Sequence, residues 1–230
     1  MIFDVITLFP GMFQGPLDDG IPARARRAGL VSVCLHDLRR FGLGPKRQVD
    51  DAPYGGGGGM VLKPEPFFAA VEWIRRTRPV PGDRIVLLSP QGAPLRHATA
   101  KRLAQLPRLI LLCGRYEGID ERVREGLVDE EISAGDVVYS GGELPALLLI
   151  DAVSRFVPGV LGRPGSADED SFAGRGLEYP YYTRPAEFLG RRVPDVLLSG
   201  DHGAIARWRE EKSREATRGK RPDLLAEGGC

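Results

Sequence analysis

The sequence predicts an α/β protein with a mainly parallel sheet, and three observations support this fold class. Short apolar runs rich in β-branched residues alternate with helix-like stretches along the first 160 residues, as in chains whose helices connect parallel strands. Two of these runs, 85–88 and 109–112, are apolar throughout, which is typical of strands covered on both faces. Gly, Pro or Asp bounds the runs, so the strands are expected to be short and to end in turns.

The individual elements follow from the same patterns. Strands are predicted at 2–8, 31–35, 85–88 and 109–112, and helices at 23–28, 66–76, 98–106 and 119–127. Residues 145–157, PALLLIDAVSRFV, have a proline where the first helical turn tolerates it and apolar residues on nearly every side. This stretch predicts a helix buried in the core.

The C-terminal third has a different composition. Residues 159–176 are rich in Gly, Ser, Ala and Asp, which predicts a mobile connection. Asp201 is a suitable N-cap for a helix that ends at about residue 217. We therefore expect a main domain at 1–160, a flexible linker at 161–175 and a small helical domain at 176–230.

Charge and cysteine usage exclude several classes of protein. The 230 residues carry 32 Lys and Arg against 31 Asp and Glu, so net charge does not by itself indicate a nucleic-acid-binding protein. Arginine-rich groups at 24–27, 39–47 and 75–78 fit solvated surfaces as well as phosphate contacts. The cysteines, at positions 34, 113 and 230, form no C-x-x-C pair, which argues against a zinc site and a disulfide framework and favours a reducing cytoplasm.

The N-terminal residues resemble a first strand rather than a targeting signal. They contain Asp4 and lack both a basic flank and a cleavage site of small residues. No apolar run approaches the roughly 18 residues that a membrane span requires. We expect no membrane partner.

Three glycine-bearing turns between Leu87 and Pro145 are the strongest indication of a ligand site. They are LLSPQG at 87–92, LCGRYEG at 112–118 and VYSGGELP at 138–145, and each is expected to follow an apolar strand. Any one of them could be an ordinary turn. Three in one α/β domain favour a ligand at the carboxyl ends of the strands, where glycine lets backbone approach it closely.

Missing motifs narrow the kind of ligand. The chain has no G-x-x-x-x-G-K-[ST], no G-x-G-x-x-G after the first strand, no H-E-x-x-H and no G-x-S-x-G, which argues against P-loop, Rossmann, zinc-protease and α/β-hydrolase sites. His36, His97 and His202 lie in unrelated contexts, and we expect structural roles for them.

Longer strings identify a family. VDDAPYGGGGGMVLKPEP, LLSPQG, LLCGRYEGIDERV, ISAGDVVYSGGELPALLLIDAVSRFVPGVLG, EDSF, EYPYYTRP and VPDVLLSGDHGAIARWR closely resemble the bacterial TrmD family, the tRNA guanine-N1 methyltransferases of the SPOUT superfamily. The match runs in order from the first strand to about residue 225. The resemblance implies a deep trefoil knot in the α/β domain, S-adenosylmethionine bound in the knot loops, tRNA as the partner, and a homodimer with its active site at the subunit interface.

The resemblance also implies cofactor-binding positions, and much of this contact is expected to use backbone groups. Leu87, Leu88 and Gln91 should line the adenine side. The residues expected around the rest of the cofactor are Gly114, Tyr116, Glu117, Ile132, Ser133, Ala134, Gly135, Asp136, Val137, Val138, Tyr139, Gly141, Gly142, Leu144 and Pro145.

The implied substrate is the guanine immediately 3′ of the anticodon, methylated at N1. Neutral guanine carries a proton there, so the reaction needs a base and a donor to the neighbouring oxygen. The resemblance assigns these roles to Asp170 and Arg155. Without it, Asp170 reads as a solvated linker acid, whereas Arg155 on an apolar helix needs a partner or a ligand.

Further substrate contacts are implied in two segments. The loop with Asp51, Tyr54 and Gly59 reads as a floppy linker because of its five glycines, but the resemblance places it at the substrate, with Asp51 recognising the neighbouring guanine. The C-terminal helix carries four basic residues that are expected either to contact tRNA phosphates or to form a solvated helix face: Arg207, Arg209, Lys212 and Arg214. The linker is expected to order on tRNA and to bring the base of one subunit to the other.

A few features depart from the family pattern or leave alternatives open. Leu87 stands where tyrosine is frequent, Tyr139 where leucine is frequent, and many relatives continue beyond the C-terminal residues of this chain. Mg²⁺ is associated with some members, yet no metal-ligand cluster places it here. A related SPOUT enzyme acting on another RNA and a non-catalytic RNA-binding module are the alternatives; the first need not keep Asp170 and Arg155, and the second has no reason to combine cofactor turns with a base.

Overall fold

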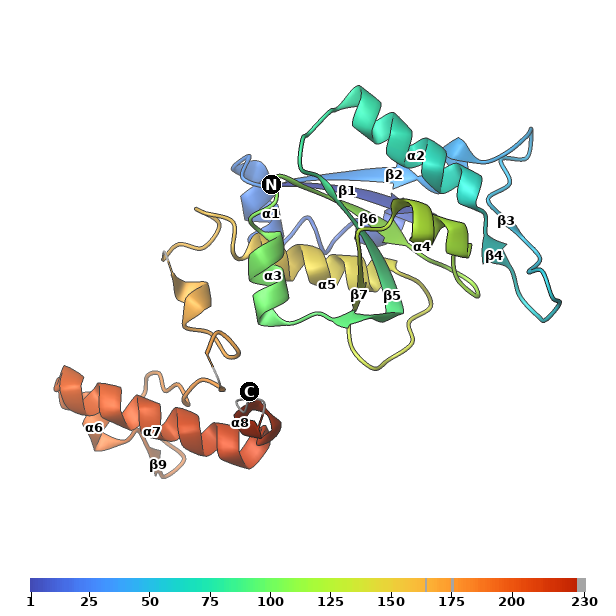
Figure 1. Cartoon of the computed structure of the whole chain (residues 1–230). Helices are drawn as coiled ribbons and strands as arrows, with labels where there is room; N and C mark the ends of the chain where they lie inside the picture. Colours follow the sequence, from blue (N-terminus) through green and yellow to red (C-terminus); the bar gives the residue numbers. More distant parts are fainter. Residues whose placement is uncertain (164, 175, 227–230) are drawn as a thin grey trace. The chain divides into compact units, whose positions relative to one another are not determined.

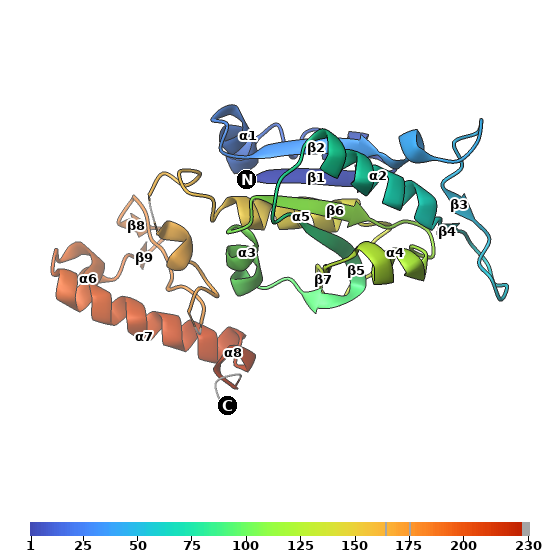
Figure 2. The same ribbon diagram turned by 45° about the horizontal axis from the view of Figure 1, so that its top comes forward.

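A five-stranded sheet organises residues Met1–Pro164, the first of two compact units (Figure 1). The structure is a computed structural model that describes residues 1–163, 165–174 and 176–226. The strands are β1 (Ile2–Thr7), β2 (Ser32–Asp37), β5 (Arg84–Pro94), β6 (Arg108–Cys113) and β7 (Glu130–Ser133). Their order is β2-β1-β6-β5-β7, with every neighbouring pair parallel, and Figure 2 shows β1 between β2 and β6. The prediction of a mainly parallel α/β fold is confirmed.

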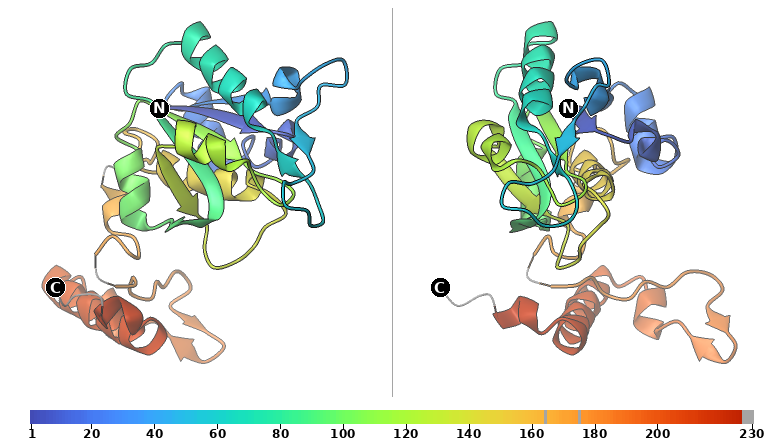
Figure 3. Two further views of the ribbon diagram at one scale, coloured as in Figure 1. Left: turned by 45° about the vertical axis from the view of Figure 1, so that its right-hand side comes forward. Right: turned by 90° about the vertical axis from the view of Figure 1, so that its right-hand side faces the viewer.

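Helices cover both faces of this sheet. On one face lie α1 (Gly20–Arg27), α3 (His97–Leu103) and α5 (Glu143–Ser154), and on the other α2 (Pro64–Thr77) and α4 (Glu121–Leu127). In the right-hand view of Figure 3, α4 and α1 lie on opposite sides of the sheet. The unit also contains two short 3-10 helices, η1 (Pro10–Phe13) and η2 (Leu38–Phe41). A two-stranded ribbon of β3 (Asp50–Asp51) and β4 (Val61–Leu62) completes it.

The alternation of side chains along β5 explains the two apolar layers. Val86 and Leu88 belong to the core under α5, whereas Ile85 and Leu87 belong to the core under α2. Successive side chains of a strand point to opposite faces, so an uninterrupted apolar run is what a doubly covered strand requires.

A buried cluster of charges joins β2, β1 and β6. Asp4 of β1 lies 2.7 Å from Nε2 of His36 in β2 and 3.1 Å from Nε of Arg108 in β6, and the side chains of Asp4 and Arg108 are fully buried. Arg78, after α2, donates to the same carboxylate at 2.9 Å. His36 is therefore part of a structural cluster, since removing either partner would leave a buried charge unpaired.

Three local expectations are wrong. The 87–92 turn is part of β5, which continues to Pro94 through an irregularity between Leu88 and Ala93. The strand before the third glycine turn is β7, and residues 134–142 form a loop. Residues 159–176, expected to lack regular structure, contain the short helix η3 (Ser166–Asp168).

The second compact unit spans Gly165–Cys230. Its elements are η3, the ribbon of β8 (Glu187–Phe188) and β9 (Arg191–Arg192), and the helices α6 (Asp195–Leu198), α7 (His202–Lys220) and α8 (Asp223–Ala226). Oδ1 of Asp201 accepts a hydrogen bond from the Ala204 amide at 2.9 Å, which confirms the predicted N-cap. Within the described residues, no helix combines the length and apolar character of a membrane span.

Candidate functional site

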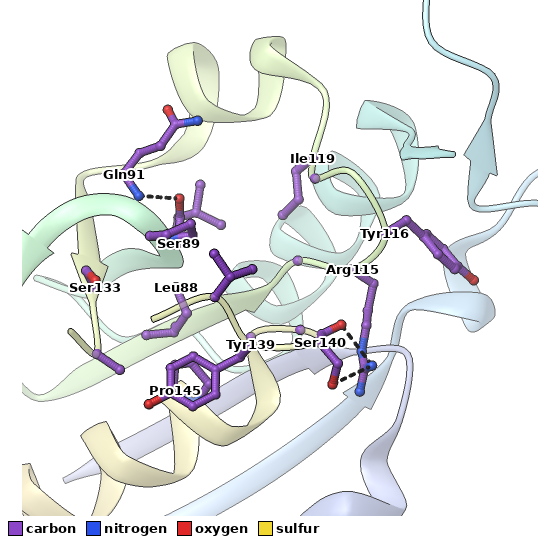
Figure 4. A pocket seen from close by; sticks show the side chains of 18 of the residues that line it. Leu88, Ser89, Gln91, Arg115, Tyr116, Ile119, Ser133, Tyr139, Ser140 and Pro145 are labelled. Atoms are coloured by element: carbon purple, nitrogen blue, oxygen red, sulfur yellow. Dashed lines mark hydrogen bonds between the residues drawn. The ribbon is translucent and has the colours of Figure 1, made fainter. Parts of the chain in front are cut away.

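A pocket lies at the carboxyl edge of the sheet, where residues 87–91 of β5 meet the segments that follow β6 and β7 (Figure 4). Because the strands are parallel, their carboxyl ends lie at one edge, and this is where ligands of open α/β sheets bind. Residues 87–91 form one wall, residues 114–119 a second, and residues 137–142 with Pro145 a third.

The structure brings most of the predicted cofactor residues together around this pocket. Those that line it are Leu87, Leu88, Gln91, Gly114, Tyr116, Glu117, Ser133, Ala134, Val137, Val138, Tyr139, Gly141, Gly142 and Pro145. The other four, Ile132, Gly135, Asp136 and Leu144, are not among its lining residues. Ile132 is buried in the core, whereas Leu144 is 44% exposed at the start of α5.

Two glycines allow the second and third walls to touch. A Cβ on Gly142 would lie 2.7 Å from Cα of Cys113, and one on Gly141 would lie 2.3 Å from Nε of Arg115. The Gly142 amide donates to the carbonyl of Gly114 at 2.9 Å. Gly142 is needed because the backbones of the two walls pass too close for a side chain, whereas a side chain at position 141 would displace the side chains of Arg115 and Glu143.

Tyr116 has a backbone conformation that is uncommon for a residue with a side chain. Its φ is 58°, in the left-handed region, and its side chain is 52% exposed. Left-handed non-glycine residues are found most often where the surrounding structure fixes the backbone for function. The second wall is thus a constrained turn rather than a flexible loop.

Sequence reasoning missed several lining residues, of which Arg115 has the most contacts. Ser89, Pro90, Arg115, Gly118, Ile119, Arg124 and Ser140 also line the pocket. The glycines on either side of Arg115 in the turn LCGRYEG could have pointed to it, because an arginine in a tight turn needs a partner for its guanidinium. Its partners lie far away in the sequence and leave no local pattern.

The glycine-rich loop is joined to the second wall. The Glu117 amide donates to the carbonyl of Met60 at 3.0 Å, and a Cβ on Gly59 would lie 2.4 Å from Oε1 of Glu117. Gly59 therefore lies beside a pocket residue. Tyr54, in contrast, is fully exposed.

Asp51 lies at the base of the glycine-rich loop, in β3. Its carboxylate accepts from the Ala52 amide at 2.9 Å and lies 3.4 Å from Nζ of Lys63. The Ala52 bond, and secondly Lys63, lower the pKa of this carboxyl group. Asp51 is consequently a charged acceptor near neutral pH.

Arg155 lies away from the pocket of its own chain. It caps the C-terminus of α5, whereas Gly142 and Pro145, at the N-terminus, line the pocket. At 1.5 Å per residue, the ten residues from Pro145 to Arg155 correspond to about 15 Å along the helix. One chain alone does not bring Arg155 to the pocket described here.

Asp170 lies in the second unit, beside a hollow built from that unit. Tyr179, Tyr181 and Arg209 are among its other lining residues. The Asp170 carbonyl accepts from the Ala173 amide at 3.1 Å.

Several basic residues of α7 have protein partners, among them Arg209 and Arg214. The Arg209 guanidinium lies 4.8 Å from the ring centroid of Tyr179, and Arg214 pairs with Glu210. Arg207 lines a shallow helix face together with acidic residues. An exposed ion pair contributes about 0–1 kcal/mol, so this pairing leaves the side chains able to exchange to a phosphate.

The described residues contain no group of three His, Cys, Asp or Glu side chains arranged to hold a metal ion. His97 lies against the ring of Phe156, with the ring centroids 4.9 Å apart. His202 is the first residue of α7. Neither histidine is among the pocket residues.

The fold and the pocket define a class: an α/β protein that holds a small ligand between glycine-bearing segments at the carboxyl ends of parallel strands. The family model described as "tRNA (Guanine-1)-methyltransferase TrmD" matches residues 1–227. The chain belongs to this family, and the resemblance inferred from its motifs is confirmed.

Curated relatives cover nearly the whole chain. A tRNA (guanine-N(1)-)-methyltransferase of Geobacter sulfurreducens is 56% identical over 225 residues, which are 98% of this chain and 91% of the relative. Proteins with the same name from Desulforudis audaxviator and Chloroflexus aggregans are 55% and 54% identical, over 98% of this chain and 90% and 88% of their own lengths.

Proposed function

We propose that the chain methylates N1 of the guanine immediately 3′ of the anticodon in tRNA. Its family and its relatives make it a tRNA (guanine-N1)-methyltransferase, and a methyltransferase of this family uses S-adenosylmethionine as the methyl donor. The observation that carries the proposal is the convergence of the three glycine-bearing segments, 87–92, 112–118 and 138–145, on one pocket.

The pocket fits the donor because it combines apolar walls with exposed backbone. Leu87 and Leu88 supply a buried apolar wall suited to adenine, and Gln91 is at the rim. Around Gly114 and Gly142 a bound molecule meets main-chain groups rather than side chains. When bound, S-adenosylmethionine supplies an electrophilic methyl group on a positively charged sulfur, so these walls need no cationic group.

Asp170 and Arg155 carry the acid-base chemistry in this proposal. The Asp170 carboxylate accepts the N1 proton of guanine, so that the nitrogen lone pair becomes available for methylation. The Arg155 guanidinium donates to guanine O6, where negative charge builds up as the proton leaves. The support for these roles is the resemblance of the EDSF and SRF strings to the family, whose model matches residues 1–227.

The same roles lead us to propose a homodimer whose partner completes each site. Arg155 lies at the opposite end of α5 from the pocket. Leu144 and Leu148, one turn apart on the same helix, are 44% and 49% exposed. Apolar side chains exposed together are typical of a surface that a second copy covers.

The deep trefoil knot also belongs to this proposal. The backbone bridge between Arg115 and Gly141 and the bond from Gly142 to Gly114 join segments that are about 25 residues apart. Such contacts are what closely packed knot loops require. We assign the reaction to the cytoplasm, where tRNA is available and where free thiols such as Cys34 and Cys113 persist.

Two segments are proposed to bind the anticodon stem and loop. Asp51 recognises the guanine on the 5′ side of the target, because a charged carboxylate accepts from both donors of its Watson–Crick edge. Tyr54 and Gly59 flank the same nucleotides. Arg207 and Arg209 of α7 neutralise phosphates.

The test is transfer of labelled methyl from S-adenosylmethionine to unmodified tRNA transcripts. The first transcript has guanine both at the target position and at the position 5′ of it. The second has adenine 5′ of the target guanine, and the third has adenine in place of the target. We expect fast transfer to the first, slow transfer to the second and none to the third. Equal transfer to all three, or transfer to none, would contradict the proposal.

A further inference from the structure

The side chain of Glu143 is a fully buried carboxylate for which the reaction has no direct use. It belongs to the first turn of α5 and is completely shielded from solvent. Burial of a charged group is costly unless ion pairing and hydrogen bonds satisfy it. Its partners therefore indicate why it is there.

Glu143 joins the end of β1 to the second pocket wall. Its Oε1 accepts from Oγ1 of Thr7 at 2.7 Å, and its Oε2 accepts from Nε of Arg115 at 3.0 Å. Burial, and secondly the Glu143 charge, raise the pKa of the neighbouring Cys113 thiol. Thr7 and Arg115 thus hold one oxygen each of the buried Glu143 side chain.

Arg115 in turn joins the second wall to the third. Its Nη1 donates to the backbone carbonyl of Ser140 at 2.9 Å and lies 3.3 Å from Oγ of the same residue. The two side chains point toward one another from opposite segments in Figure 4. Its Nη2 lies 3.0 Å from Sδ of Met12, and its guanidinium carbon lies 4.4 Å from the ring centroid of Phe9.

All three guanidinium nitrogens of Arg115 therefore point to protein partners. An arginine that bound the carboxylate of a ligand would direct its fork into the pocket. Here the fork is directed at the walls, and Gly141 lies so close that a Cβ there would be 2.5 Å from Cδ of Arg115. The geometry is that of a clamp between two loops.

We propose that Arg115 and Glu143 are positioning residues that fix the spacing between the Gly114–Gly118 and Ser140–Gly142 walls before the methyl donor binds. This role rests on the proposed location of the donor in the pocket. Pre-formed walls bind a ligand without a further ordering cost. Loss of the clamp should weaken donor binding while leaving tRNA binding unchanged.

The experiment compares Arg115→Met, Glu143→Gln and the double variant with the wild type by calorimetric titration with S-adenosylmethionine. Arg115→Met keeps an unbranched apolar stem in place of the aliphatic part of arginine but removes the guanidinium and all its donors. Since a misplacement of about 1 Å can cost about 100-fold, we expect Kd and KM for the donor to rise about 10- to 100-fold. KM for tRNA should change less than about twofold, because the clamp does not touch the proposed tRNA contacts.

Conservative substitution and coupling separate positioning from simple destabilisation. Glu143→Gln keeps one acceptor for Arg115, and its amide group can donate to the Thr7 hydroxyl in place of the bond that Thr7 now donates, so its loss of affinity for the methyl donor should be several-fold smaller than that of Glu143→Ala. The double variant should be no worse than Arg115→Met alone, because both single changes break the same pair.

Arg78→Met is the matched control. Arg78 also donates to a buried carboxylate, Asp4, at 2.9 Å, but it does not line the pocket. We expect it to lower the melting temperature without changing Kd for the donor. Unchanged donor affinity in Arg115→Met, or equal loss in Arg78→Met, overturns the positioning role.

The wild type distinguishes this inference from the cofactor assignment. If wild-type protein binds the donor and Gly142→Val abolishes binding, the pocket is the donor site whatever the Arg115 result. If the wild type shows no saturable binding, the assignment of the pocket fails, and the positioning role falls with it.

Discussion

At the scale of single residues, the proposed catalysis and substrate recognition depend on two carboxylates, Asp170 and Asp51. Their local sequence does not distinguish them from solvated surface acids. Asp170 stands in a stretch of Gly, Ser, Ala and Asp, and Asp51 precedes five glycines. Family motifs, not periodicity, predicted roles for both. The structure adds that Asp51 is held in place by Ala52 and Lys63, contacts that a linear pattern does not reveal.

Replacing Asp170 with Asn should reduce methyl transfer at least about 100-fold, because a positioned general base contributes about 10²- to 10⁴-fold. Donor affinity should stay within about twofold of wild type, since Asp170 is not among the pocket residues. Single-turnover rates and calorimetry measure the two quantities. The matched control is Asp168→Asn, a nearby acid, and near-normal turnover of Asp170→Asn would refute its role as base.

Replacing Asp51 with Ala should reduce the preference for guanine 5′ of the target about 10-fold or more, the effect of one lost bidentate contact. The ratio of kcat/KM for the two transcripts measures it, with Asp50→Ala as the control. Because its neighbours lower the pKa of Asp51, the wild-type preference should persist as pH falls into the range where an unperturbed aspartate begins to protonate. A preference unchanged in Asp51→Ala would count against the assignment.

At the scale of elements, the sequence predicted the strands of the sheet better than it predicted the pocket walls. Apolar runs define β1, β5 and β6 because burial on both faces leaves a strong pattern. β7 was missed because three of its four residues, EEIS, are polar. The continuation of β5 through SPQG was missed because these residues are typical of turns. Gly92 explains the exception, since a Cβ there would lie 2.4 Å from the backbone of Glu131.

The contacts between walls were beyond sequence reasoning for a different reason. Gly59 meets Glu117, and Arg115 meets Ser140 and Glu143. These pairs are separated by 25 residues or more, and nothing in local periodicity links them. These residues come into contact only in the folded protein, where the carboxyl ends of the parallel strands lie at one edge of the sheet.

Gly142→Ala tests the closeness of the second and third walls. The added Cβ would lie 2.7 Å from Cα of Cys113 and 3.0 Å from the Gly114 amide nitrogen, so backbone must shift. We expect KM for the donor to rise about 10-fold or more, with a smaller change in kcat. Gly162→Ala, where an added Cβ meets no atom within 4 Å, should leave KM unchanged; a similar effect of the two changes would contradict the pocket geometry.

The double change Arg207→Ala, Arg209→Ala tests α7 as a phosphate-binding element. Each lost phosphate contact should reduce the slope of log K against log salt by roughly one, so tRNA binding should become less dependent on salt. Filter binding at several salt concentrations between about 50 and 200 mM measures the slope. Arg84→Ala, Arg102→Ala removes two exposed arginines of the other unit and should not alter it. An unchanged slope in the α7 variant would favour the solvated-face interpretation.

At the scale of the whole molecule, the proposed site is divided between two copies of the chain. The pocket proposed for the donor lies at the N-terminal end of α5 and Arg155 at its C-terminal end. Sequence motifs predicted both sets of residues, but their separation along one helix is a property of the three-dimensional structure. It gives a physical reason for a dimer that neither composition nor charge could supply.

Subunit complementation tests this division most directly. One variant carries Asp170→Asn and keeps the pocket; the other carries Gly142→Val and keeps the base. Neither homodimer should transfer methyl to tRNA at an appreciable rate. After the two are unfolded, mixed in equal amounts and refolded, half of the dimers should be mixed, with one of two sites intact, so activity should return to about a quarter of wild type. If the mixture stays as inactive as its components, the pocket and the base belong to the same chain and the account is wrong.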